Sequence, residues 1–482
     1  MQCINVLIKD KSKSLQKPRV CKEGIMLKGI MEEKKSLVRD LSDGPVLSTM
    51  LSFAFPIMLA NALQAVYNMV DMIVVGRFVG PTGLSGVGIG GNLQTLFLTF
   101  GMGFANGAQI VISQQVGMKS SRISKSIGTL LTLEFIMAVI IGAIGIIFHA
   151  PLLNMLNTPE ASYDQAMAYM VICSAGMIFI FEYNALCAVL RGMGESKLPM
   201  VFVGIASIIN VVLDIIFVGP CGWGAGGAAA ATVIAQAVAC ICAAVYLYRH
   251  KEAAQFDFKL KSFGIDKEQL KALCRLGVPS IVQMLMITVS LAFVNSRINL
   301  YDVTASAVDT VGNKLATIVN ILTGAISVAS GSMVAQSFAA GKMDRIKKIV
   351  HVAVAVGLIW FVVMAACYLL LPRQIFGIFT TDQAVLDMAP AYCRIMVLWL
   401  LAACTMFAPY AVVKGIGFAS YDMFVGIMDG VVARIGLAML FGNIAGLYGY
   451  WTGNAIAGFV TTILMGGYYL TGKWKTRKVI TR

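Results

Sequence analysis

Long runs of apolar residues constrain this chain more than any other feature. Of its 482 residues, 58% are apolar and only 13% are charged, whereas an ordinary soluble domain is about half apolar and a quarter charged. A helix needs about 20 mostly apolar residues to cross a bilayer, and runs of that length recur along the chain. This pattern excludes a soluble enzyme, a nucleic-acid-binding protein and a disordered chain.

The apolar runs predict twelve membrane-spanning helices. Membrane strands would alternate polar and apolar residues, and these runs do not. The second and eighth segments are the weakest, because they are rich in Gly, Ser, Thr and Asn. The twelve segments lie near residues 47–75, 84–112, 124–148, 164–190, 198–218, 224–248, 271–297, 304–338, 345–371, 383–413, 421–441 and 446–470.

Positive charge marks one side of the membrane. The chain carries 38 Lys and Arg against 24 Asp and Glu. Most of the basic residues lie in the two ends and in every second loop, and basic loops stay in the cytoplasm. We therefore expect both termini to be cytoplasmic, with a basic tail over 1–45, a linker over 249–270 and a second tail over 471–482. This topology accounts for the charge, so we expect no nucleic-acid partner.

The two halves of the chain resemble each other at an offset near 223 residues. Pro56 opens the first segment and Pro279 opens the seventh, and the stretch 107–117 before one basic loop matches the stretch 331–341 before another. Six spans per half is an even number, so the two halves share one orientation about an axis along the membrane normal. The sequence thus predicts an all-α membrane protein built from two pseudo-symmetric six-helix bundles.

The two predicted bundles, over 46–248 and 271–470, favour transport by alternating access about a central cavity. The weak, glycine-interrupted second and eighth segments occupy equivalent places in the two halves. They are interpreted either as walls of the cavity or as helices whose glycines only allow close packing.

Polar side chains inside the spans are the candidate functional residues, since a charge at mid-bilayer costs roughly 2.5–3.5 kcal/mol. In the first segment Gln64, Tyr67, Asn68 and Asp71 follow one another at short helical spacings. Residues three or four apart share one face of a helix. We expect this face to border the cavity.

The fifth and sixth segments add to this set. Asn210 and Asp214 are one helical turn apart, and Thr232 is followed one turn later by Gln236. Two carboxylates close together in a dry cavity cannot both stay ionised, so Asp71 and Asp214 would share a proton. Alternatively they would bind a hard cation such as Na⁺ through oxygens that Asn and Thr also supply. A purely structural Asn–Asp pair is the competing interpretation.

The second half lacks these polar residues. Positions equivalent to the two aspartates and the asparagine are near Val294, Leu437 and Ala433, and a pure folding requirement should apply to both halves. The asymmetry favours function. Asp309, in the eighth segment, is expected to face the cavity from the second lobe and to attract a cationic substrate. Its alternative role is an ion pair with Lys314.

Two further pairs of charged residues lie within the spans. Asp429 and Arg434, in the eleventh segment, are predicted to form a structural ion pair. Glu134 and Glu182, in the third and fourth segments, either belong to a proton path or lie protonated near a lipid-facing end.

These segments together resemble the multidrug and toxic compound extrusion (MATE) family over about residues 45–470. The resemblance rests on FPIMLANALQAVYNMVDMIVVGRFVG in the first segment, on GAQIVISQQVG and RGMGESKLPM, and on N-x-x-x-D in the fifth. One departure is RIGLAML in the eleventh segment, where the family often has a proline.

Within that family, the chain looks more like the branch with archaeal and DNA-damage-inducible bacterial members. The resemblance implies a cation site in that branch at positions that match Asp71, Asn210, Asp214 and Thr232. The second branch uses acidic residues in helices 7 and 10, and the seventh segment of this chain has none.

The resemblance implies a monomeric antiporter of the plasma membrane that exports amphipathic, often cationic, drugs in exchange for H⁺ or Na⁺, without a cofactor. The alternative is a flippase for lipids or lipid-linked oligosaccharides from the same superfamily; twelve spans rather than fourteen, and an acidic first lobe, speak against it. A membrane enzyme is the third hypothesis. Because HExxH, GxSxG and GxxxxGK[ST] are absent, we expect no enzyme and no ATPase.

Overall fold

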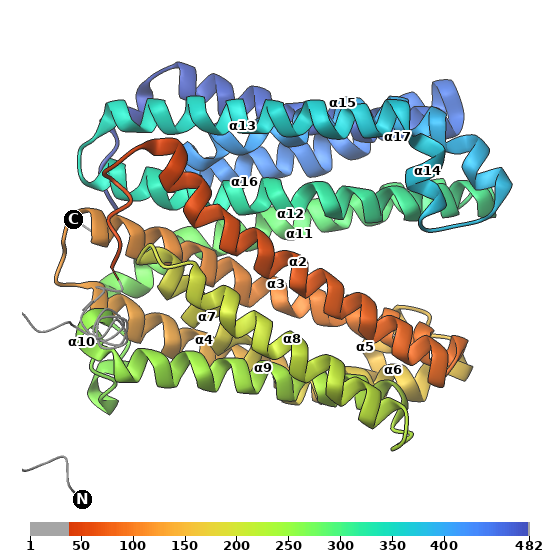
Figure 1. The fold of residues 1–482 in the computed structure, drawn as a ribbon, viewed down its shortest axis with the longest axis horizontal. Coiled ribbons are helices and arrows are strands. Elements are labelled where there is room, and N and C mark those ends of the chain that lie inside the picture. Colours follow the sequence, from red (N-terminus) through yellow and green to blue (C-terminus); the bar gives the residue numbers. More distant parts are fainter. Residues whose placement is uncertain (1–37, 481–482) are drawn as a thin grey trace, which may run out of the picture. The chain divides into compact units, whose positions relative to one another are not determined.

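The computed structural model describes residues 38–480, and every regular element within them is a helix (Figure 1). The predicted basic tails fall partly outside this range, at residues 1–37 and 481–482. The first half of the chain, the N-lobe, consists of α2 (Val46–Phe78), α3 (Pro81–Gly117), α4 (Ile123–Ile147), α5 (His149–Met155), α6 (Glu160–Ala175), α7 (Met177–Gly192), α8 (Lys197–Val218) and α9 (Gly224–Arg249).

The second half, the C-lobe, repeats this order of long helices. It consists of α11 (Lys267–Ile298), α12 (Val303–Ala339), α13 (Met343–Leu370), α14 (Pro372–Gly377), α15 (Gln383–Gly415), α16 (Ala419–Ile427), the π-helix η2 (Met428–Ile435) and α17 (Gly436–Leu470). The short helices α10 (Lys251–Ala254) and η1 (Leu260–Phe263) lie between the lobes in sequence, and η3 (Lys473–Thr476) follows α17.

Within the described residues, ten helical stretches are long and apolar enough to cross a membrane, and the bent pair α6–α7, with an angle of 53°, makes an eleventh. One stretch, 419–470, has 52 residues and at 1.5 Å per residue would be more than twice as long as the hydrocarbon core is thick. The chain reverses inside it at Ala445 and Gly446, where Gly446 has a φ of +59°. The backbone of Gly453 then packs against Leu437. This stretch is therefore a helical hairpin, which gives the twelve predicted spans.

The π-helix η2 holds a buried ion pair. Asp429 Oδ1 lies 2.9 Å from Arg434 Nη2, and both side chains are less than a tenth exposed. Arg434 Nη1 also donates to Asn454 Oδ1 at 2.7 Å, and the Thr461 hydroxyl donates to Asp429 Oδ2 at 2.6 Å. In an α-helix, residues five apart point about 140° apart around the axis. The wider turn of a π-helix aligns positions i and i+5, so the backbone irregularity is what lets the predicted pair form.

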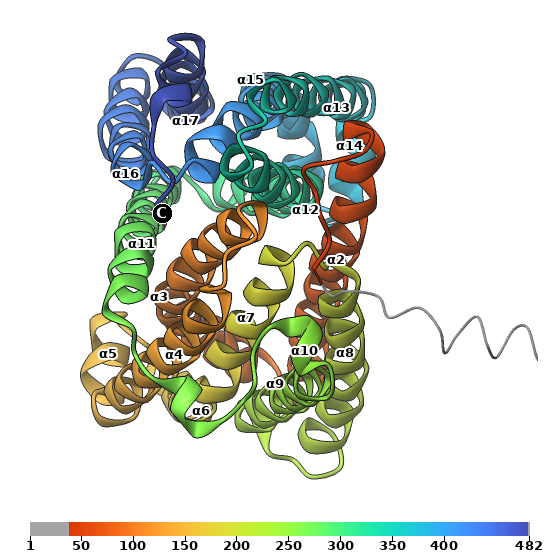
Figure 2. The ribbon, with the colours of Figure 1, turned by 90° about the vertical axis from the view of Figure 1, so that its left-hand side faces the viewer.

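The first helix of each half packs against both lobes. Met50 and Phe53 of α2 belong to the same buried cluster as Ala329 and Met333 of α12. On the opposite side of the molecule, α11 lies between α3 of the N-lobe and α16 of the C-lobe, as the view in Figure 2 shows. The two lobes therefore meet along α2 and α11 as well as between α3 and α12.

The two lobes contact each other along the parts of their helices that lie nearer the basic loops. We call this contact the seam. Gln109 Nε2 donates to Ser332 Oγ at 2.8 Å, and Gln114 Nε2 donates to the Gly415 carbonyl at 2.8 Å. Gly107 lies so close to α11 that an added methyl group would stand 3.0 Å from the Gly277 nitrogen. Toward the other side, α2 and α12 diverge (Figure 1). The two lobes are thus in close contact on the basic side, and these two helices separate toward the other side.

Residues near both ends of the described chain cross the seam. Leu41 N donates to Gln336 Oε1 of α12 at 2.7 Å, while Arg39 N donates to the Met193 carbonyl of the N-lobe at 2.8 Å. At the other end, Ile480 N donates to Gln114 Oε1 of α3 at 3.2 Å. These two segments connect the lobes on the closed side.

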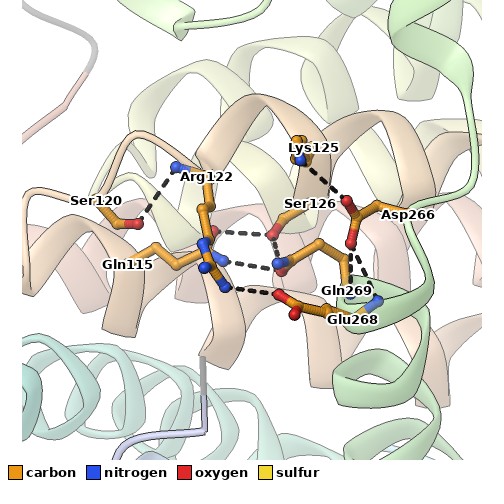
Figure 3. Close-up of polar contacts among 8 residues, drawn as sticks. All are labelled: Gln115, Ser120, Arg122, Lys125, Ser126, Asp266, Glu268 and Gln269. Carbon is orange, nitrogen blue, oxygen red and sulfur yellow. Dashed lines mark hydrogen bonds and ion pairs between the residues drawn. The ribbon is translucent and has the colours of Figure 1, made fainter. Parts of the chain in front are cut away.

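Two ion pairs connect the start of α4 to the start of α11 (Figure 3). Arg122 Nη1 lies 2.7 Å from Glu268 Oε2, and Lys125 Nζ lies 3.2 Å from Asp266 Oδ2. Asp266 also caps α11 by accepting the backbone N–H of Gln269. That N–H, together with Lys125, lowers the pKa of the Asp266 carboxyl below its ordinary value. Exposed ion pairs of this kind contribute at most about 1 kcal/mol each.

Beneath these ion pairs lies a buried polar contact (Figure 3). Gln115 Nε2 donates to Gln269 Oε1 at 3.0 Å, and the Ser126 hydroxyl lies 2.6 Å from Gln269 Oε1 and 2.9 Å from Gln115 Oε1. All three side chains are almost wholly buried. Leaving one of these groups without its partner would cost about 1–3 kcal/mol, so the first turn of α11 is held firmly to the N-lobe.

We expect Gly117→Ala to loosen the seam. An added methyl group would overlap the backbone carbonyl of Gln336 in α12, and overpacking of this kind typically costs about 1–3 kcal/mol. Because only the closed arrangement bears that cost, its population relative to other arrangements should fall roughly 5- to 150-fold. Hydrogen–deuterium exchange of the peptides that contain the ends of α3 and α12 should increase.

The matched control is Gly331→Ala, also at the seam. There an added methyl group would meet only Ile110 Cδ1, at an ordinary distance of 3.8 Å. Equal exchange in the two variants would contradict the expectation.

Candidate functional site

A cavity of about 490 Å³ lies mainly within the N-lobe. It is bordered by α2, α3, α6, α7, α8 and α9, and of its described lining residues only Lys314 comes from the C-lobe. Four of the predicted cavity residues line it: Gln64, Tyr67, Asn68 and Gln236. Its volume is within the range of pockets that hold drug-sized molecules, about 300–1,000 Å³.

Helix α8 carries its two acidic-site residues on a regular stripe of buried positions. Its buried positions Phe202, Ala206, Asn210, Asp214 and Val218 recur every four residues, which places them on one face. The opposite face carries exposed apolar side chains such as those of Ile208, Val212 and Ile215. An apolar lipid-facing side and a polar inner side therefore orient the asparagine and the aspartate inward.

The four predicted cation-site residues come together from three helices. Asp71 of α2 and Asp214 of α8 lie close enough for their charges to interact, and they are 5% and 0% exposed. Asn210 Nδ2 donates to the Thr232 hydroxyl of α9 at 3.3 Å. Asp71 and Thr232 also border the cavity, so this site and the cavity are continuous.

Several oxygens of this site have no partner in the described chain. They are Asp71 Oδ1, Asn210 Oδ1 and both carboxylate oxygens of Asp214, and each is buried. Two ionised carboxylates in such a position would repel each other, and a proton or a cation between them would relieve that repulsion. The unpartnered oxygens, with the Thr232 hydroxyl, form the all-oxygen donor set that a hard cation such as Na⁺ prefers. The residues thus fit both ions.

Polar side chains connect the acidic site to the rest of the cavity. Gln64 Nε2 lies 3.4 Å from the Tyr67 hydroxyl, and Gln236 lies near the same hydroxyl. Tyr67 is buried one turn before Asp71 on α2. A molecule in the cavity would therefore reach these side chains before it reached the aspartates.

Asp309 is the predicted cavity residue that lies outside the described lining. Its carboxylate accepts a hydrogen bond from Asn313 Nδ2 at 3.1 Å and another, at 3.1 Å, from the Asn295 side-chain amide in its better-satisfied orientation. The side chain is 7% exposed. These amides hold it inside the C-lobe, and it forms no ion pair with Lys314 within the described residues.

Two basic residues of the cavity were not predicted from the sequence. Lys314 projects from α12 and Arg191 lies near the end of α7, and both line the cavity. The signal for Lys314 is its place inside a span, but from the sequence it is considered only as the alternative ion-pair partner of Asp309. Glu134, another intramembrane carboxyl, is wholly buried with neither oxygen partnered, and neither it nor Glu182 borders this cavity.

Comparison with known families matches both halves of the chain to one model. The MatE family model matches residues 56–216 and again residues 279–440. The matches begin at Pro56 and Pro279, the two prolines that open the predicted halves. The internal repeat is therefore a repeat of the same family unit.

The similarity to individual relatives extends over most of the chain. It is 31% identical over 442 residues to the probable multidrug resistance protein YoeA of Bacillus subtilis (strain 168), covering 90% of this chain and 95% of that protein. It is 22% identical over 364 residues to the multidrug export protein MepA of Staphylococcus aureus (strain NCTC 8325 / PS 47), covering 74% and 79%.

Solved structures share the fold. An outward-facing conformation of a multidrug resistance MATE family transporter of the MOP superfamily superposes with a TM-score of 0.85 at 22% identity, covering 92% of this chain and 99% of that one. A MOP superfamily transporter from Pyrococcus furiosus gives 0.85 at 21% identity, with the same coverage. The two-bundle arrangement predicted from the sequence is confirmed.

Proposed function

This chain belongs to the multidrug and toxic compound extrusion (MatE) family, and from that premise we propose that it exports amphipathic organic compounds in exchange for H⁺ or Na⁺. Members of this family are membrane transporters rather than enzymes, and the chain is a multi-pass protein of the cell membrane. The observation that carries the proposal is the buried pair Asp71–Asp214, whose unpartnered oxygens adjoin a drug-sized cavity.

The exchange follows from the position of Asp71. Its side chain belongs both to the acidic pair and to the cavity lining. A proton or cation between Asp71 and Asp214 removes their mutual repulsion and lets α2 and α8 pack closely. A substrate in the cavity contacts the same helix. Both ligands therefore act on one two-state equilibrium, and they compete if each favours a different arrangement of the lobes.

The observed arrangement fits the outward-facing half of such a cycle. The lobes are closed at the seam on the basic side, which the charge of the loops assigns to the cytoplasm. The seam must open to admit a substrate from the cytoplasm. One chain supplies both lobes and the whole cavity, so the proposal needs no second subunit.

A flippase for lipid-linked oligosaccharides remains the alternative function. It would need room for a sugar headgroup and a lipid chain, whereas the cavity of about 490 Å³ suits a drug-sized molecule. The acidic pair also has no evident use in moving a lipid downhill. We therefore favour exchange-driven export.

The test is transport in reconstituted vesicles. The protein is inserted into liposomes loaded with a fluorescent amphipathic dye, and either a pH gradient or a Na⁺ gradient is imposed. We expect one of the two gradients to accelerate dye movement well above the rate in protein-free vesicles, and ATP alone to have no effect. Dye movement driven by ATP, or movement that ignores both gradients, would contradict the proposal.

A further inference from the structure

Lys314 is a positive charge deep in a membrane span without a protein counter-charge. It lies eleven residues into α12, which begins at Val303, or about 16 Å along the helix axis. Its side chain is exposed to the cavity. No carboxylate in the described chain lies within ion-pair distance of it. Ionisable residues at such depth usually serve a substrate or an ion.

Arg191 adds a second positive charge to the same cavity. Its Nε donates to Gln109 Oε1 at 3.1 Å, and Gln109 in turn bonds Ser332 across the seam. This contact fixes the guanidinium at the end of the cavity near the seam. Its remaining N–H groups make no hydrogen bond to the described protein and are free to bind a ligand.

The charges around the cavity do not suit a simple organic cation. Lys314 and Arg191 contribute two positive charges, and the pair Asp71–Asp214 contributes at most two negative charges. When the pair holds one or two protons, the positive charges are in excess. In no protonation state is the cavity net negative, so it offers a bare cation no net electrostatic attraction.

We propose that Lys314, together with Arg191, recognises an anionic group on the transported compound, so that the preferred substrates are amphipathic zwitterions rather than bare cations. A carboxylate on the substrate would pair with Lys314 on the C-lobe wall, and a positive group on the same molecule would face Asp71. This inference rests on the proposed export function and names its substrate class. It differs from the expectation of often cationic substrates, which the family resemblance implies and which Asp309 was expected to support.

A substrate that binds Lys314 would also contact both lobes. Every other described lining residue belongs to the N-lobe. A zwitterion bound between Lys314 and Asp71 would therefore bridge the two bundles, whereas a cation would contact the N-lobe alone. Lys314 is thus a specificity-determining residue that contacts the substrate directly.

The test compares two dyes that differ in one charge. A rhodamine with a free benzoate is a zwitterion at neutral pH, and its methyl ester is a cation of nearly the same size. Binding of each dye to the purified protein in lipid nanodiscs is measured by fluorescence polarisation. We expect the wild type to bind the zwitterion more tightly. We expect Lys314→Gln to weaken zwitterion binding roughly tenfold, about what one charge-assisted hydrogen bond contributes, and to leave ester binding unchanged or tighter, because a positive charge that repels the cation is removed.

Two variants serve as controls. Lys314→Arg keeps the charge and should keep the preference for the zwitterion. Arg297→Gln removes a basic residue of the adjacent helix α11 that lies over the Phe293 ring and does not line the cavity, so it should change neither affinity. Ester binding reports on the fold of each variant.

The inference is overturned if the wild type binds the two dyes equally, binds neither, or if Lys314→Gln weakens both to the same extent. Failure of the export proposal would be seen separately. In that case an ion gradient would fail to drive either dye in vesicles, while the binding preference and its loss in Lys314→Gln would still be measured.

Discussion

Replacing Asp71 with asparagine should abolish ion-driven export, reducing the gradient-dependent rate roughly hundredfold. Asparagine has almost the same size and keeps the hydrogen-bonding capacity of the side chain, but it can neither release a proton nor carry the negative charge that binds a cation. The coupling between two ligands of one transporter is typically worth 1–3 kcal/mol, and this change removes it. The measurement is dye movement in vesicles under an imposed gradient, with dye binding measured in parallel.

The matched control for Asp71→Asn is Glu182→Gln. Glu182 is an acidic side chain of the same lobe, inside a span and partly buried, but it does not line the cavity. This control should export dye at nearly the wild-type rate. Equal rates for Asp71→Asn and the wild type would remove Asp71 from the coupling mechanism, and equal losses in both variants would point to the other buried carboxyls instead.

Arg434→Gln should have the largest effect on stability, lowering the free energy of unfolding by about 3–5 kcal/mol. Removing one partner of a buried ion pair leaves the other charge uncompensated, and Asp429 is 4% exposed. Thr461 would be the single remaining donor to Asp429 among the described contacts. The measurement is a denaturant or thermal unfolding curve of the purified protein.

The double variant Asp429→Asn with Arg434→Gln distinguishes the lost ion pair from lost packing. Neutral amides at both positions leave no buried charge and can still bond Thr461 and Asn454. Removing both charges should therefore cost only about 1 kcal/mol. A double variant as unstable as Arg434→Gln alone would assign the effect to packing around the π-helix rather than to charge.

The spans could be predicted because apolar length is a property of the local sequence. The apolar runs predict a turn between residues 441 and 446, and the chain reverses at the end of that interval, at Ala445 and Gly446. The π-helix could not be foreseen, because it depends on contacts between segments. The eleventh segment lacks the proline that the family often has at this place. Its irregularity is instead the π-helix, in which Gly430 packs against the Met286 carbonyl of α11.

The acidic site could be predicted because helical spacing alone places Asn210 and Asp214 on one face. The two interpretations of the glycine-rich second segment each hold for one part of α3. Gly88 and Gly91 line the cavity, whereas Gly107 and Gly117 pack at the seam.

Asp309 and Lys314 were harder to place. They lie five residues apart on α12, so they point to different sides of the helix, and no sequence pattern says which side faces the other lobe. Asp309 is held by two asparagine amides, one of which comes from another helix. That partner is invisible in the sequence, and the choice between the two residues required the packed structure.

The confinement of the acidic pair to one lobe sets a thermodynamic ceiling. Two carboxylates can accept at most two unit charges per turnover, and 100 mV of membrane voltage supplies about 2.3 kcal/mol for each. Since about 1.4 kcal/mol corresponds to a tenfold ratio, a cargo without net charge could be concentrated outside the cell by a factor of roughly two thousand and no further. A steeper accumulation would require either a chemical gradient of the driving ion or a third group that accepts it. On the C-lobe side, the described cavity lining offers only a lysine, Lys314, which cannot replace an acidic acceptor.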